Sequence, residues 1–160
     1  PKSRYITTLT GLIIAAGGSA SAISAIYLGR LSDRIGHKKM LLFMTTGAAL
    51  AFAAQAAVSS PWQLLILRIV SGSFMGGMLP SANALINSLI PGERKGTAFG
   101  VSTSFSLMGT VLGPISGGLI GASPIGYRGV FILTSVLLLV TALWIKRIKV
   151  KGAIDQSLDQ

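Results

Sequence analysis

Side chains that could carry chemistry are scarce in this chain, and nearly all of them lie outside its long apolar stretches. The carboxylates and the imidazole are those of Asp33, Glu93, Asp155, Asp159 and His37. The sequence offers no nucleophile beside a base, no cluster of metal-ligating residues and no cysteine. We therefore expect no enzyme, no cofactor, no metal centre and no disulfide.

Arg68 is the exception, because it lies inside an apolar stretch, about six residues or 9 Å from the outer end of its predicted helix. A charge at that depth is costly and by default functional. The alternative is that its long side chain reaches back to the outer headgroups. No acid of this chain lies at membrane depth, so a carboxylate partner for Arg68 would have to come from outside the chain.

The elements that position these residues are apolar helices. Hydrophobic residues make up 51% of the chain and charged residues 11%, whereas soluble proteins carry about 25% charged residues. A membrane-spanning helix needs about 20 apolar residues. Because lipid offers no hydrogen-bond partners, the backbone polar groups of such a stretch must bond to one another, as they do in a helix. The sequence predicts an all-α integral membrane domain over 1–160, with five transmembrane helices and a cytoplasmic tail at 146–160. The predicted spans are 6–28, 40–58, 62–90, 97–121 and 127–145.

The positive charge follows the predicted topology. Although the net charge of +10 could indicate nucleic acid, the Lys and Arg residues gather in connections that five spans place on one side of the membrane, which marks the cytoplasm. We expect no nucleic-acid partner, an outer N-terminus and a cytoplasmic C-terminus. The clusters are Arg30, Arg34, Lys38, Lys39; Arg94, Lys95; and Lys146, Arg147, Lys149, Lys151.

Small residues recur every four positions in several spans, a spacing that lets helix backbones approach closely in lipid. The first span carries Gly17, Ser21, Ala25 and Gly29, and the fourth carries Gly109, Gly113, Gly117 and Gly121. These columns indicate close packing, or a hinge in the fourth span. Pro80 and Pro114 lie inside predicted helices and are expected to kink them.

The run from Gly29 to Lys39 resembles the signature cytoplasmic loop of the major facilitator superfamily, G-x-L-(A/S)-D-R-x-G-R-(K/R), and lies between two spans on the positive side. His37 stands where this superfamily usually has Arg. The matching residues, which we take as a cytoplasmic gating loop, are Gly29, Leu31, Asp33, Arg34, Gly36 and Lys38.

Two further motifs resemble the same superfamily. Arg68 and Gly72 look like its R-x-x-x-G element, and the fourth span looks like the G-x-x-x-G-P-x-x-G-G pattern of its drug:proton antiporter branch. The residues of that hinge-like motif are Gly109, Gly113, Pro114, Gly117 and Gly118.

The resemblance implies twelve helices in two halves, with the loop after the second and the eighth. Five spans then match helices eight to twelve, or two to six. The segments 80–85 and 126–131 and the short tail favour eight to twelve, whereas the G-P-x-x-G-G pattern is best known from the fifth helix.

By this resemblance the chain is part of a bacterial inner-membrane carrier that exports lipophilic drugs in exchange for protons by alternating access. Asp33 would hold the two halves shut at the start of a helix in the other half. Alternatively, Asp33 only pairs with Arg30 or Arg34 in a solvated loop. The expected partners are membrane lipid, the missing half, a small lipophilic substrate and the proton, whose titrating group would lie in that half.

Apolar, aromatic and thioether side chains on the third and fourth spans suit a cavity for bulky lipophilic compounds, although ordinary helix packing would use the same residues. A strongly charged substrate such as phosphate is less expected. Two other functions stay open: a sugar or other solute carrier of the same superfamily, and a truncated, non-transporting partner subunit. The candidate cavity residues are Phe74, Met75, Met78, Asn83, Ser102, Phe105, Ser106 and Met108.

Overall fold

The structure, a computed structural model, describes residues 2–148, with side chains from residue 8 onward. Five helices in this part of the chain are long and apolar enough to cross a membrane, as the sequence predicts. Most of the predicted tail, 149–160, lies outside the described residues. The elements are α1 (Lys2–Ile35), α2 (His37–Ala56), α3 (Pro61–Leu89), the short 3₁₀ helix η1 (Gly92–Arg94), α4 (Lys95–Gly121) and α5 (Gly126–Arg147).

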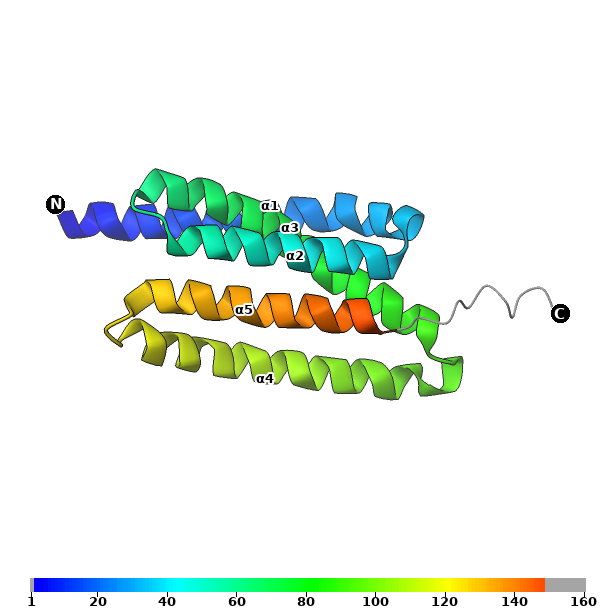
Figure 1. Cartoon of the computed structure of the whole chain (residues 1–160). Helices are drawn as coiled ribbons and strands as arrows, with labels where there is room; N and C mark the ends of the chain where they lie inside the picture. The colour runs from blue at the N-terminus through cyan, green and yellow to red at the C-terminus, as the bar shows by residue number, and fades with distance from the viewer. Residues whose placement is uncertain (1, 149–160) are drawn as a thin grey trace.

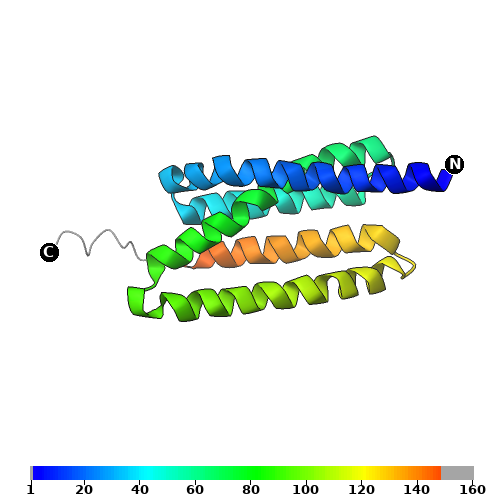
Figure 2. The ribbon, with the colours of Figure 1, turned by 180° about the vertical axis from the view of Figure 1, so that it is seen from behind.

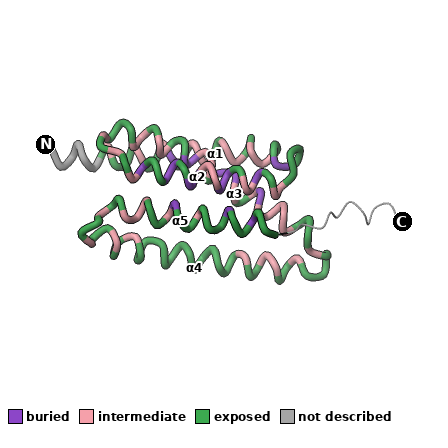
Figure 3. Tube along the Cα trace, viewed as in Figure 1, coloured by how far each residue is buried: buried purple, intermediate pink, exposed green. Residues whose placement is uncertain are grey.

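Helix α2 lies at the centre of the bundle, between α3 and α5, while α1 packs along α3 and α4 lies at the edge beside α5 (Figures 1 and 2). The side chains of α2 form most of the small core, and Met44, Ala48 and Ala49 are fully buried. No residue of α4 is buried, and Figure 3 shows this helix without the buried colour. The described helices therefore cover α2 well and leave α4 bare.

Glycines allow α1 and α3 to cross in close contact. A Cβ at Gly72 would overlap the carbonyl oxygen of Gly17, and a Cβ at Gly76 would overlap that of Ser21. The Ser24 hydroxyl adds a hydrogen bond of 2.7 Å to the Ser73 carbonyl oxygen across the same contact. The small-residue stripe predicted on the first span is thus a packing surface.

The predicted gating loop at 29–39 is helical on both sides of a single residue, which corrects the expectation of a loop. Helix α1 continues to Ile35, seven residues beyond the predicted end of the first span, and α2 starts at His37. Only Gly36 leaves the helical conformation, with φ of 97°, in a region that glycine tolerates at low cost. The charges did not end the helix, because a helix that has left the apolar part of a membrane can carry polar side chains.

Pro80 and Pro114 interrupt neither helix, since α3 and α4 continue through them. One missing hydrogen bond is tolerated when the turns before and after it stay helical. Both helices are therefore continuous through their proline, and the expected kinks stay a prediction.

The described residues of the three basic clusters share one end of the bundle, which we call the basic end. It holds the turn at Gly36, the turn at η1 and the end of α5, while the α2–α3 and α4–α5 turns lie at the opposite end (Figure 1). Of the third cluster, Lys149 and Lys151 lie outside the described residues.

Candidate functional site

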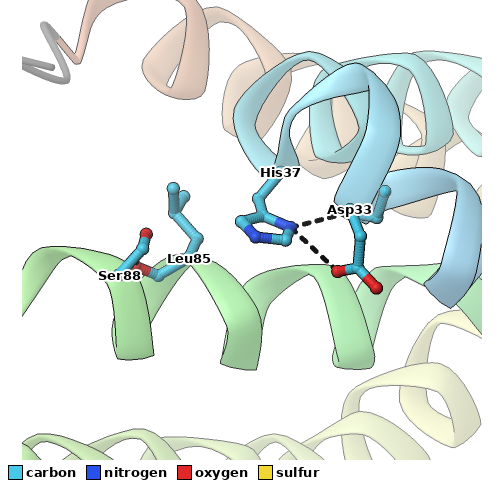
Figure 4. A network of polar contacts seen from close by, with 5 residues as sticks. Asp33, His37, Leu85 and Ser88 are labelled. Atoms are coloured by element: carbon cyan, nitrogen blue, oxygen red, sulfur yellow. Dashed lines mark hydrogen bonds and ion pairs between the residues drawn. The ribbon is translucent and has the colours of Figure 1, made fainter. Parts of the chain in front are cut away.

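Asp33 extends from the last turn of α1 at the basic end, and its side chain is 71% exposed. Its Oδ1 lies 3.9 Å from Nδ1 of His37, the first residue of α2. The buried Ser32 hydroxyl lies 3.0 Å from the same ring nitrogen, whose contact with Asp33 is drawn in Figure 4. Within the described residues Asp33 has no ion pair with Arg30 or Arg34, so the solvated pair weighed from the sequence is not formed there.

Lys38 links two helices of the bundle at the basic end. Its Nζ donates to the carbonyl oxygen of Lys146 at 3.3 Å and to that of Ile148, at the end of α5. A cation at this place satisfies carbonyl groups that a helix end leaves without partners. Lys38 therefore joins the start of α2 to the end of α5.

The other motif residues lie on α1 and at its turn into α2. Gly29 faces Pro80 of α3, with 3.9 Å between a Cβ built at Gly29 and the Pro80 Cβ. Leu31 and Arg34 are exposed at the end of α1, and Gly36 makes the turn.

Arg68 is half-buried and lies on the α3 face that crosses α1. Its Cγ lies 3.0 Å from where a Cβ of Gly17 would be, so the absence of a side chain at Gly17 makes room for the arginine stem. Arg68 lines a cavity of about 480 Å³ between α1, α2, α3 and α5, and a second one of about 230 Å³ between α1, α3 and α5.

The eight predicted cavity residues do not meet in one place. Met75 lines the larger cavity beside Arg68. Phe74 instead packs edge-on against Phe43 of α2, with ring centroids 5.7 Å apart. Ser102 lines a separate groove at the basic end, between α3 and α4.

The remaining five predicted residues lie elsewhere. Met78 and Asn83 are half-buried on α3, whereas Phe105, Ser106 and Met108 are exposed on α4. The α4 face that carries them has no neighbour in the described part of the chain.

The hinge-like glycines of α4 share this exposure. Among the described residues, nothing lies within 4 Å of a Cβ built at Gly109, Gly113 or Gly118. Only Gly117 has a neighbour, a Val130 methyl group at 3.9 Å, and Pro114 is exposed.

Sequence reasoning missed a buried polar link between α2 and α3. Gln55 is fully buried, and its Nε2 donates to the Leu67 carbonyl oxygen at 3.1 Å and to the Ser71 hydroxyl at 3.0 Å. The sequence does carry a signal for this link, because Gln55 is an amide side chain in an alanine-rich apolar helix. Such a side chain in lipid forms hydrogen bonds to a neighbouring helix. Ser135 makes a similar link from α5 to the Ala49 carbonyl oxygen, at 2.8 Å.

Five apolar helices with a charged motif at one end define a polytopic membrane protein, and the sequence fits one superfamily of transporters. The profile of the Major Facilitator Superfamily matches residues 6–157. The chain belongs to this superfamily, and its fold is a part of that superfamily's fold.

Bacterial relatives described as "Multidrug resistance protein MdtG" are similar to most of the chain. The protein of Dickeya zeae is 42% identical over 120 residues, which are 75% of this chain and 29% of the relative. That of Serratia proteamaculans is 36% identical over 136 residues, 85% and 33% of the two chains. That of Citrobacter koseri is 38% identical over 131 residues, 82% and 32%. The chain thus spans about a third of the length of these relatives.

Proposed function

We propose that this chain is part of a carrier that exports lipophilic drugs in exchange for protons. The observation that carries the proposal is the identity of 36–42% to multidrug resistance proteins over most of the chain. The chain would supply helices eight to twelve, and the remaining helices of the carrier would supply the other walls of the cavity.

Alternating access would move the two halves of the carrier about a site near the middle of the membrane. Asp33 would hold the cytoplasmic side closed by lying against the positive start of a helix in the other half. Its exposed carboxylate at the basic end supports this role, as does the bare face of α4, which a helix of the other half would cover.

The proton would be carried by a group outside this chain. Proton coupling needs a side chain that titrates within the membrane, normally Asp, Glu or His. The described members of this set are Asp33, His37 and Glu93, and all three lie at the basic end. The proposed partners are therefore the rest of the carrier, the proton, a lipophilic substrate and the lipid of the bacterial inner membrane.

Efflux of a lipophilic dye tests the proposal. Cells that express the complete carrier should accumulate less ethidium than cells with an empty vector, and an uncoupler should remove the difference. Expression of the 160 residues alone should leave accumulation unchanged. Ethidium efflux that persists without a proton gradient would contradict the exchange, and a complete carrier that moves only sugars would contradict drug export.

A further inference from the structure

A pocket of about 330 Å³, which we call the outer pocket, lies at the end of the bundle opposite the basic end. Its walls come from α1, the turn between α2 and α3, the start of α3 and the start of α5. The volume lies within the range of about 300–1,000 Å³ that is usual for small-molecule sites. Among its lining residues are Leu9, Ile13, Gln55, Val58, Leu64 and Tyr127.

Gln55 gives the outer pocket a fully buried polar side chain. Its Nε2 donates to the Leu67 carbonyl oxygen at 3.1 Å, and because a carbonyl can only accept, this contact fixes which end of the amide is nitrogen. The Oε1 atom at the other end is buried and has no hydrogen-bond partner in the described part of the chain. Buried polar atoms almost always have a partner, so a donor for this oxygen is expected from elsewhere.

The free amide oxygen restricts the chemistry of a ligand. It only accepts hydrogen bonds, so the ligand has to carry an O–H or N–H group, which an ionised oxyanion lacks. A cation is disfavoured as well, because no described acid lines the outer pocket and an unpaired buried charge is costly. Arg68 also lines the adjoining small cavity, which shares Ile13 and Leu64 with the outer pocket. A neutral compound fits best.

The rest of the outer pocket suits an apolar body. Leu9, Ile13 and Leu64 are half-buried, so each turns part of its side chain away from the surroundings. Tyr127 is exposed, and its ring packs edge-on against Phe131 with ring centroids 6.3 Å apart. The pocket therefore combines a single buried acceptor with apolar and aromatic walls.

We propose that the outer pocket binds a neutral, largely apolar compound with one O–H or N–H group, which donates to the Gln55 amide oxygen. Gln55 would then serve two partners: its nitrogen holds α3, and its oxygen holds the ligand. The inference goes beyond drug export, since binding at this pocket needs neither transport nor a proton gradient.

Two probes with one ring system test the inference: 2-naphthol, which has a hydroxyl donor, and 2-methoxynaphthalene, which has none. Tritium-labelled probes are measured by scintillation proximity on the purified complete carrier in nanodiscs, with empty nanodiscs as the blank. The lipid is phosphatidylcholine, whose headgroup has no O–H or N–H to compete. The wild type should prefer 2-naphthol by about 3- to 10-fold, the usual worth of one neutral hydrogen bond.

Two variants separate the acceptor from the helix link. Gln55→Met keeps the length of the side chain and removes the acceptor, so 2-naphthol should lose its preference while 2-methoxynaphthalene binds as before. Ser71→Ala removes one partner of the amide nitrogen and leaves the oxygen in place. Ser71 does not line the outer pocket, and both probes should bind to Ser71→Ala as to the wild type.

A third variant keeps Gln55 and so covers the case in which Gln55→Met does not fold. In a cysteine-free complete carrier, Leu64→Cys places a thiol in the wall of the outer pocket. 2-Naphthol should slow its reaction with N-ethylmaleimide more than 2-methoxynaphthalene does at the same concentration.

Each other result overturns the inference. Equal binding of the two probes to the wild type would mean that water or a helix of the other half satisfies the amide oxygen. If Gln55→Met weakens both probes alike, Gln55 only supports the shape of the bundle, and if it weakens neither, the oxygen takes no part. Probes that neither bind nor protect Leu64→Cys would show that the outer pocket is no site. Drug export stands in all of these cases, because ethidium efflux tests it separately.

Discussion

At the scale of single residues, the two charged residues Asp33 and Lys38 of the motif at the basic end differ in their contacts. Lys38 donates to the last carbonyl groups of α5 and so acts within this part of the protein. The Asp33 side chain is largely exposed, and its Oδ1 lies 3.9 Å from Nδ1 of His37. The proposed contact with the other half therefore depends on Asp33, whereas Lys38 links α2 to the end of α5 within the described bundle.

Asp33→Asn in the complete carrier should slow dye export by about tenfold, because a carboxylate at a helix start contributes up to ~2 kcal/mol. The asparagine keeps the shape and loses the charge, so the amount of folded carrier should not change. Initial rates of ethidium efflux measure the effect. Glu93→Gln is the matched control, since this exposed acid at the same end lies outside the motif; equal losses in both variants would refute the role of Asp33.

Lys38→Met should lower the stability of the bundle by about 0.5–1 kcal/mol, because the last carbonyl groups of α5 lose their cation. Lys39→Met removes a neighbouring exposed lysine with no hydrogen bond in the described structure, and should have a smaller effect. Thermal unfolding of both variants in detergent gives the comparison. A melting temperature that is lower for Lys39→Met than for Lys38→Met would contradict the capping role.

At the scale of helices, glycines serve opposite purposes in α3 and α4. Gly72 and Gly76 are in contact with the backbone of α1, whereas Gly109 and Gly113 face no described residue. Glycines four residues apart therefore pack against another helix in α3, whereas in α4 they lie on a face without a described neighbour.

Gly72→Ala should destabilise the 160-residue chain in detergent by about 1–3 kcal/mol, as overpacking does, because the new methyl group overlaps the Gly17 carbonyl oxygen. Gly109→Ala should be neutral in that chain and destabilising in the complete carrier, where the proposal places another helix over α4. Thermal unfolding of both variants in both proteins separates the two cases. A neutral Gly72→Ala would mean that α1 and α3 do not pack as described.

The sequence predicted these helices well and the positions of their side chains less well. Stretches of about 20 apolar residues made the number of helices predictable, and the stripe from Gly17 to Gly29 predicted a packing face. The cavity was harder, because neighbouring helices decide which side of α3 is covered. Phe74 and Met75 are adjacent in sequence, yet one packs on α2 and the other lines the cavity.

At the scale of the whole molecule, the charges give the bundle a direction. The described lysines and arginines of the three clusters gather at the end that holds Gly36 and η1. The turns at the opposite end, Ala57–Ser60 and Ala122–Ile125, carry no charge. Because positive connections stay in the cytoplasm, the whole bundle should insert with the basic end inside.

Single cysteines test this orientation, since the chain has none of its own. In a cysteine-free complete carrier, Ser123→Cys should react with a membrane-impermeant maleimide added to intact cells. Gly92→Cys should react only after the membrane is made permeable. Labelling of Gly92→Cys in intact cells would place the basic end outside and would also contradict the role proposed for Asp33.

The one-residue turn at Gly36 also has a genetic consequence. A helix turns by about 100° per residue, so one codon added next to Gly36 would rotate either the motif on α1 or the face of α2 that holds Met44 and Ala48. A codon lost there would do the same in the opposite sense. Populations should therefore lose every change in length at this turn, whereas point changes at exposed positions without a motif role, such as Ile35, should be tolerated.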